Sequence, residues 1–149
     1  MKEYVVAVLG ATGAVGQEMM NLLAERNFPI KKLVPLASAR SAGRSLKFKG
    51  EDVKIELACD EAFEGIDIVL GAAENDIAEK FAPAIVKAGA VFVDNSSAFR
   101  LRDDVPLVVP EVNPEDVKWN KGIISNPNCS TIITITAVNA LNSIAPFAP

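Results

Sequence analysis

The feature that most constrains the fold is a short apolar run, residues 4–9, that leads directly into three evenly spaced glycines. A continuous apolar run of this length is typical of a strand buried on both faces of a parallel sheet. Glycines between a strand and a helix permit a tight turn, close approach of the backbone to a pyrophosphate, and close packing of the helix. The alternative is an ordinary glycine turn. We predict a dinucleotide-binding loop made of Gly10, Ala11, Thr12, Gly13, Ala14, Val15 and Gly16.

Strand-like and helix-like segments alternate along the rest of the chain. This alternation predicts an α/β fold: a Rossmann-like, doubly wound, mostly parallel sheet with helices on both faces. Residues 1–149 are expected to form one dinucleotide-binding domain. The expected strands are 33–37, 66–70, 91–93, 107–109 and 123–124, with a hairpin over 46–49 and 53–57; the expected helices are 17–25, one through 78–86, and 130–142.

Composition excludes several classes of function. The net charge is −4 with no basic run, so we expect neither nucleic acid nor an anionic membrane as a partner. No apolar stretch approaches the roughly 20 residues of a membrane span. The chain has no histidine, which rules out imidazole-based zinc sites and Ser-His triads within it, and we expect no metal. Two cysteines, Cys59 and Cys129, favour a reducing compartment, and the cytoplasm is the default.

The segment after the second expected strand indicates which dinucleotide is bound. NAD sites usually carry an acidic residue about 20 residues beyond the glycines, where it binds the ribose hydroxyls. Residues 37–44 contain no acid and instead offer two arginines and two serines. Guanidinium groups match phosphate geometry with paired hydrogen bonds. We therefore predict NADP, with Ser38, Arg40 and Ser41 at its 2′-phosphate; the alternative is a solvated basic loop.

Residues 126–131 place Cys129 between amide side chains and the start of an expected helix. The partial positive charge at a helix N-terminus favours thiolate over thiol, and a thiolate attacks carbonyl groups. The competing interpretation is that Cys129 is a small buried hydrophobe, the usual fate of a free cysteine. Cys59 lacks such surroundings and is expected to be structural. A nucleotide loop and an activated cysteine together point to an aldehyde dehydrogenase that acts through a thioester.

Four segments in order, residues 10–16, 94–100, 109–113 and 126–131, resemble the signatures of the aspartate-β-semialdehyde dehydrogenase family. The resemblance covers about residues 4–140. It implies NADP-dependent reductive dephosphorylation of β-aspartyl phosphate to aspartate semialdehyde and phosphate, a step toward lysine, threonine and methionine. It also implies that Cys129 is the nucleophile, that Asn128 helps to build the substrate pocket, that Arg100 binds phosphate, and that Asn95 and Ser97 lie near the nicotinamide.

The same resemblance implies that part of the site lies elsewhere. The family places a histidine base, a second arginine and a glutamine in a domain beyond the cysteine, whereas this sequence stops at Pro149. We therefore expect an N-terminal domain without its catalytic and dimerisation domain, and we expect a homo-oligomer because the missing domain would leave apolar surface exposed. Two alternatives stay open: a domain similar to N-acetylglutamyl-phosphate reductase, and a non-catalytic NADP(H)-binding module.

Overall fold

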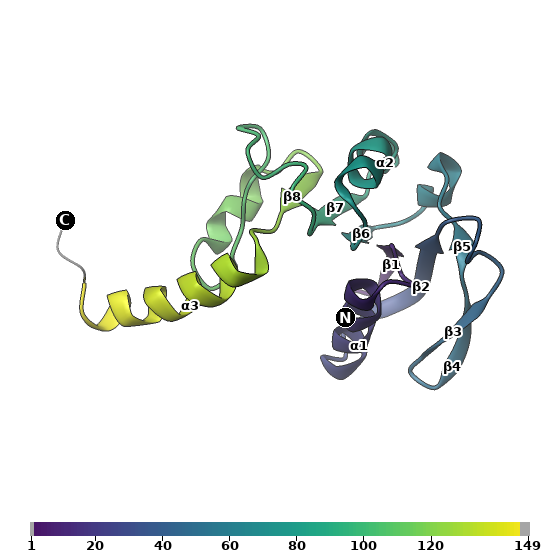
Figure 1. Cartoon of the computed structure of the whole chain (residues 1–149), viewed down its shortest axis with the longest axis horizontal. Coiled ribbons are helices and arrows are strands. Elements are labelled where there is room, and N and C mark those ends of the chain that lie inside the picture. The colour runs from purple at the N-terminus through teal and green to yellow at the C-terminus, as the bar shows by residue number, and fades with distance from the viewer. Residues whose placement is uncertain (1, 147–149) are drawn as a thin grey trace.

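The computed structural model describes residues 2–146 and is built on a six-stranded sheet in the order β5-β2-β1-β6-β7-β8 (Figure 1). Every pairing within this sheet is parallel. The order reverses between β1 and β6, which creates the switch point where open α/β sheets bind ligands. The predicted Rossmann-like fold is confirmed. The strands are β1 (Tyr4–Leu9), β2 (Ile30–Ala37), β5 (Glu56–Leu57), β6 (Ile68–Gly71), β7 (Val91–Asp94) and β8 (Ile123–Ser125).

Helix α1 (Ala14–Glu25) packs on one face of the sheet. Its buried Met20 joins a core cluster with Val8 of β1 and Leu33 of β2. The helix begins three residues earlier than the sequence pattern predicts. Leu22 of the same helix is exposed. Two residues correspond to about 200° of rotation around a helix, so Leu22 points away from the sheet once Met20 faces it.

Helix α2 (Asn75–Lys87) and the 3₁₀ helix η1 (Asp60–Phe63) cover the opposite face (Figure 1). The predicted apolar positions Ala78, Phe81 and Ile85 are buried there, together with Ala82. Val86, predicted on the same stripe, is exposed. The rings of Phe63 and Phe81 lie 5.5 Å apart and begin a core that extends to strands β1, β2, β6 and β7. This cluster is the larger of the two, and through it α2 packs against the middle of the sheet.

The predicted hairpin forms a separate two-stranded ribbon, β3 (Ser45–Phe48) and β4 (Glu51–Lys54). Its turn contains Gly50 with a φ of +87°, a conformation that glycine adopts without strain. Pro35 lies within β2, where a proline cannot donate a ladder hydrogen bond. The pairing of β2 with β5 begins only at Leu36, so the side of β2 facing β5 has no ladder to lose at Pro35.

The strand predicted over 107–109 is wrong: only an isolated bridge, between Leu107 and Ser125, is formed there. The backbone N–H of Val109 donates to the side-chain oxygen of Asn113, and the Asn113 amide donates back to the oxygen of Leu107. An Asn side chain that satisfies nearby backbone groups competes with sheet formation. The chain turns into the 3₁₀ helix η2 (Pro114–Trp119) instead of continuing along β8.

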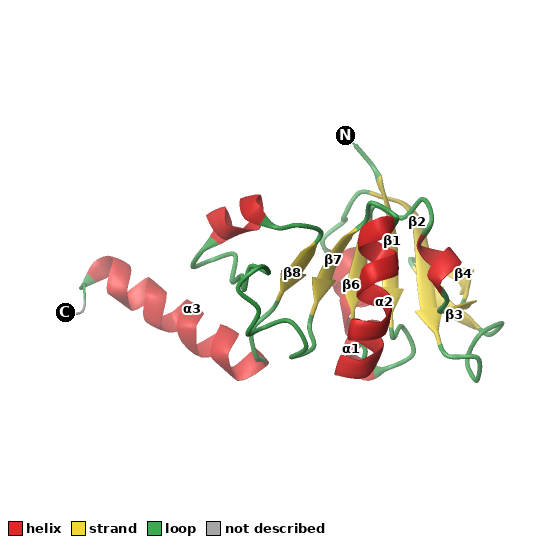
Figure 2. Cartoon of the chain, turned by 90° about the horizontal axis from the view of Figure 1, so that it is seen from above, coloured by secondary structure: helices red, strands yellow, loops and turns green. Residues whose placement is uncertain are grey.

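Helix α3 (Cys129–Ile144) confirms the last predicted helix and begins at the cysteine itself. It extends away from the sheet (Figures 1 and 2), and none of its side chains is buried. It also contains no charged residue. Exposed apolar surface of this kind is typical of a contact surface for other protein segments. Its large exposed side chains are Ile133, Ile135, Val138, Leu141 and Ile144.

Candidate active site

The predicted site residues follow the carboxyl ends of neighbouring parallel strands. Because all six strands run in the same direction, the loops that follow them meet at one edge of the sheet. The strand order places these loops side by side, and their spatial order along the edge differs from their order in the chain. Across the edge, the loops are 38–44 after β2, 10–16 after β1, 72–75 after β6, 95–100 after β7, and 126–128, leading to Cys129, after β8.

The glycine loop makes a tight turn at the switch point. Gly10 has a φ of +88°, and a Cβ at this position would lie 2.6 Å from the backbone oxygen of Ala72. A Cβ on Gly16 would lie 2.4 Å from the oxygen of Gly10, so glycine is needed for the helix to pack against the turn. At Gly13 a Cβ would meet only that same oxygen, at 3.5 Å. The protein itself does not require glycine at position 13, and the loop there is open.

The loop after β2 is a compact turn. The backbone N–H groups of Ser41 and Ala42 both donate to the oxygen of Ser38, and the segment is then joined to Ile55 by two further backbone bonds. Ser38 and Arg40 are exposed. Arg44, which was not among the residues predicted to bind the 2′-phosphate, lines a cavity of about 290 Å³ beside this turn. The lining of this cavity brings Arg44 and Lys47 together with Ala11 and Thr12 of the glycine loop.

The loop after β7 is tied to the start of α2. The side-chain oxygen of Asn75 accepts a hydrogen bond from the backbone N–H of Ser97 at 3.0 Å, and its amide donates to the Ser97 hydroxyl at 2.8 Å. Ser97 therefore holds a fixed position beside the switch point. Sequence reasoning missed Asn75, although its position between a predicted strand and a predicted helix was a usable signal.

Arg100 connects two of these loops. Its Nε donates to the backbone oxygen of Asn126 at 2.8 Å, and its Nη2 donates to the backbone oxygen of Asn95 at 3.0 Å. The guanidinium is half-buried. An arginine has five N–H donors, so these two bonds leave others for an anion. The two loops therefore hold the Arg100 side chain in place.

Cys129 is exposed at the first position of α3. The side-chain oxygen of Asn128 accepts from the Ser130 backbone N–H at 3.0 Å and from the Ser130 hydroxyl at 2.6 Å. Asn128 is therefore the N-cap of the helix, a residue type strongly preferred there. The Cys129 sulfur lies 3.8 Å from the same oxygen. Cys129 is therefore not buried within the part of the chain that the structure describes, and its interpretation as a buried hydrophobe is wrong there.

One ionisable group is fully buried at this edge. Asp94, the last residue of β7, is 0% exposed, and burial raises the pKa of its carboxyl above the ordinary value. Hydrogen bonds from Ser96 and the charge of Arg100 act in the opposite direction but do not outweigh the burial. The carboxyl is accordingly easier to protonate than a solvated aspartate.

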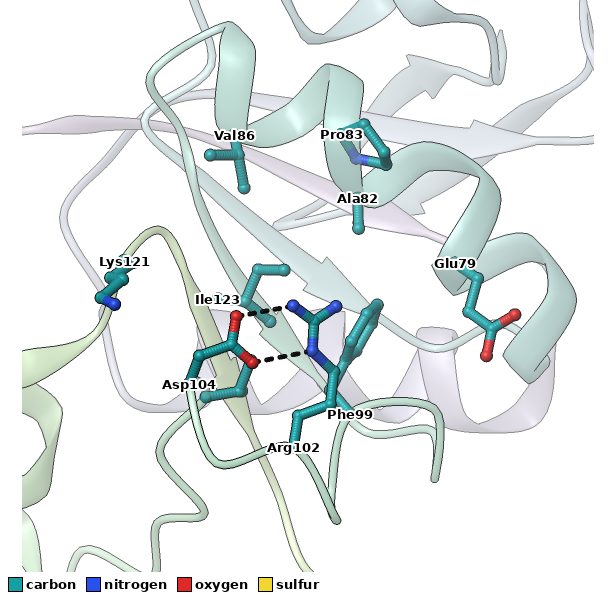
Figure 3. A pocket seen from close by; sticks show the side chains of 10 residues that line it. Glu79, Ala82, Pro83, Val86, Phe99, Arg102, Asp104, Lys121 and Ile123 are labelled. Carbon is teal, nitrogen blue, oxygen red and sulfur yellow. Dashed lines mark hydrogen bonds and ion pairs between the residues drawn. The ribbon is translucent and has the colours of Figure 1, made fainter.

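A pocket of about 360 Å³ lies elsewhere, between α2 and the loop after β7 (Figure 3). Arg102 and Asp104 form a bidentate ion pair at its rim, which lowers the pKa of the Asp104 carboxyl. None of the predicted site residues lines this pocket. The apolar residues of its lining are Ala82, Pro83, Val86, Phe99, Val105 and Ile123.

The parallel sheet, the glycine turn at its switch point and the polar loops along one edge define a dinucleotide-binding domain of the Rossmann-like class. Residues 5–120 match the family described as semialdehyde dehydrogenase, NAD binding domain, and the chain belongs to this family. A curated relative, the aspartate-semialdehyde dehydrogenase of Synechocystis sp., is 53% identical over 142 residues. That alignment covers 95% of this chain and 42% of the relative.

Solved structures agree with this assignment. Aspartate semialdehyde dehydrogenase II of Vibrio cholerae, solved in complex with ASA, superimposes with a TM-score of 0.91 at 42% identity, over 95% of this chain and 47% of that one. The Candida albicans enzyme, solved with NADP, superimposes with a TM-score of 0.80 at 31% identity, over 97% of this chain and 48% of that one. The chain thus spans less than half the length of these relatives.

No three His, Cys, Asp or Glu side chains within residues 2–146 come together in a way that could hold a metal ion. None of the helices in the same range combines the length and apolar character required to cross a membrane.

Proposed function

We propose that this chain is the NADP(H)-binding, cysteine-bearing domain of an aspartate-semialdehyde dehydrogenase acting in lysine, threonine and methionine biosynthesis. The observation that carries the proposal is the order of the loops along the sheet edge. A 2′-phosphate at 38–44, a pyrophosphate at 10–16, a nicotinamide near Asn95 and a nucleophile at Cys129 would follow one another in space, as one extended dinucleotide and its substrate require.

The residues present fit this cofactor. Gly13 has neither a positive φ nor a crowded Cβ position, so packing within the chain does not account for the glycine. A pyrophosphate that approaches the backbone there would account for it. Arg40 is exposed and free to meet a 2′-phosphate, and Arg44 lies in the cavity that the glycine loop shares. No acidic side chain occurs between residues 26 and 50 to favour a 2′-hydroxyl.

The chemistry we propose starts at the exposed sulfur of Cys129. The thiolate attacks the carbonyl carbon of β-aspartyl phosphate, a C–S bond forms, and the C–O bond to phosphate breaks with its electrons on the departing phosphate. Arg100 would bind that phosphate with the donors that Asn95 and Asn126 leave unused. When bound, the nicotinamide supplies the hydride that reduces the thioester to the aldehyde. The C–S bond then breaks and the thiolate of Cys129 is restored.

We propose further that the chain binds NADP(H) alone but turns over little or no substrate. It contains no histidine to act as a base, and a positioned general base commonly contributes about 10²- to 10⁴-fold to the rate. The exposed apolar side chains of α3 support self-association into a homo-oligomer. The two free thiols support a cytoplasmic setting.

Fluorescence titration and thiol labelling test the proposal together. We expect saturable binding of NADPH, weaker binding of NADH, and faster iodoacetamide labelling of Cys129 than of half-buried Cys59. Bound NADPH should slow the labelling of Cys129 alone. Absence of saturable binding would overturn the assignment. Equal, slow labelling of the two thiols would favour a non-catalytic binding module. Near-normal turnover with phosphate, aspartate semialdehyde and NADP would refute the inactivity of the chain.

A further inference from the structure

A buried carboxyl group lies directly beneath the loop that follows β7. Asp94 pairs in register with Gly71 of β6 on one side and with Ser125 of β8 on the other. Its Oδ2 accepts a hydrogen bond from the Ser96 hydroxyl at 2.6 Å. The Ser96 oxygen in turn accepts from the backbone N–H of Ala98 at 3.1 Å. The carboxyl therefore fixes the first turn of the loop through a single serine.

This arrangement decides which side chains of the loop face outward. Asp94 and Ser96 are buried, whereas Asn95 between them is half-buried and Ser97 is exposed. The backbone oxygen of Asn95 is presented to Arg100, and the backbone oxygen of Asp94 accepts from the N–H of Asn126. A change in the turn would move the predicted nicotinamide side of the site and the approach to Cys129 together.

The buried carboxyl is costly for the fold. Within residues 2–146, Oδ1 of Asp94 has no hydrogen-bond partner. The lack of a side chain at Gly71 leaves room for this oxygen, because a Cβ there would lie 2.8 Å from the oxygen and 2.7 Å from the ring of Phe92. An unpaired buried oxygen of a charged group is destabilising, and a smaller apolar side chain would avoid that cost. Stability alone therefore gives no reason for an aspartate here.

We infer that Asp94 is a positioning residue: acting through Ser96, it holds Asn95 and Ser97 toward the cofactor and Arg100 against the cysteine loop. This inference rests on the proposed function. Asp94 would not contact the reacting atoms and would act only by holding the loop in place. The essential property is the acceptor oxygen that faces Ser96. Charge is not required, so an asparagine, which keeps a carbonyl oxygen at that place, should perform the same role.

Four variants of the chain test this role by NADPH titration. Ser96→Ala and Asp94→Ala should each weaken NADPH binding on the order of tenfold, the equivalent of one ordinary hydrogen bond at the upper end of its range. Asp94→Asn should restore binding to within about threefold of the wild type. Ser143→Ala removes a serine hydroxyl that bonds only within exposed α3 and should leave binding unchanged. Hydrogen exchange at the amides of 95–98 should accelerate in Ser96→Ala and not in Asp94→Asn.

The alternatives give different results. Wild-type affinity in Ser96→Ala, or an Asp94→Asn variant as weak as Asp94→Ala, would overturn the inference; the latter would show that charge matters. If the wild-type chain bound no NADPH, the proposed function would fail, and amide exchange at 95–98 would still decide whether Asp94 and Ser96 order the loop. Unchanged exchange in Ser96→Ala would refute the positioning role independently of any cofactor.

Discussion

Nε of Arg100 donates to the backbone oxygen of Asn126 across 26 residues of sequence, at 2.8 Å. Together with the bond to Asn95, it fastens the loops after β7 and β8 to one side chain. Lysine presents a single ammonium and cannot reproduce this planar fork. We expect Arg100→Lys to lower the free energy of unfolding by about 1–2 kcal/mol. Urea denaturation measures this loss, and hydrogen exchange at the backbone amides of Asn126 and Asn128 should accelerate.

Arg102→Lys is the matched control, two residues away. The Arg102 guanidinium is exposed and pairs with exposed Asp104. Exposed ion pairs contribute little because solvent screens them. We expect its urea midpoint to match the wild type. Equal losses in the two variants would show that the contacts of Arg100 have no special importance.

Substitutions in the glycine loop can distinguish a glycine needed for packing from a glycine needed for cofactor binding. Ala at position 16 would place a Cβ 2.4 Å from the oxygen of Gly10, so Gly16→Ala should cost about 1–3 kcal/mol of stability. Gly13→Ala meets no such contact and should unfold at the wild-type urea concentration. If a pyrophosphate approaches the backbone, Gly13→Ala should still bind NADPH at least tenfold more weakly. Wild-type affinity in that variant would place the pyrophosphate elsewhere.

Cofactor preference should depend on the turn after β2. Arg40 is exposed, and a charge-assisted bond to a 2′-phosphate contributes about 1.5–3 kcal/mol. Arg40→Ala should therefore raise the Kd for NADPH about 10- to 100-fold and leave the Kd for NADH unchanged. Arg26→Ala, at the exposed end of α1, serves as the control. An equal effect on the two cofactors would argue against a 2′-phosphate site at Arg40.

The cap of α3 can be tested by substitution of its side chain. Asn128→Ala removes the acceptor for the Ser130 backbone N–H and should lower the free energy of unfolding by about 1 kcal/mol. Asn128→Asp and Asn128→Ser keep a capping oxygen and should lose much less. Helix content by circular dichroism and urea denaturation measure the effect. A loss as large in Asn128→Ser as in Asn128→Ala would show that capping is not the main role of Asn128.

Asp94 should make stability depend on pH. Burial raises its folded-state pKa above the unfolded value, so folding favours the protonated carboxyl. Its contribution to stability is fully present below the unfolded pKa, about 4, and is lost as the pH rises through the folded pKa. Asp94→Asn remains neutral. We expect the variant to gain stability relative to the wild type as the pH rises through this window, by urea denaturation. A constant difference across the window would contradict the prediction.

The strands, the helices and the glycine turn were largely predictable from sequence, because each depends on neighbours a few residues away. The apolar run of Tyr4–Leu9 and the spacing of Ala78, Phe81 and Ile85 are such local signals. The prediction failed at 107–109, where residues that look like a strand lose their backbone partners to the side chain of Asn113. Apolar patterning does not reveal such competition.

The family, the glycine turn and the thiol at the head of a helix could be assigned without coordinates, since ordered motifs record these directly. The folded protein was needed to show that Arg100 holds Asn126, that Asn75 holds Ser97, and that the carboxyl of Asp94 is buried. These contacts join residues far apart in the chain. Which of them form depends on which strands become neighbours in the sheet, and strand order is a property of the whole fold rather than of any segment.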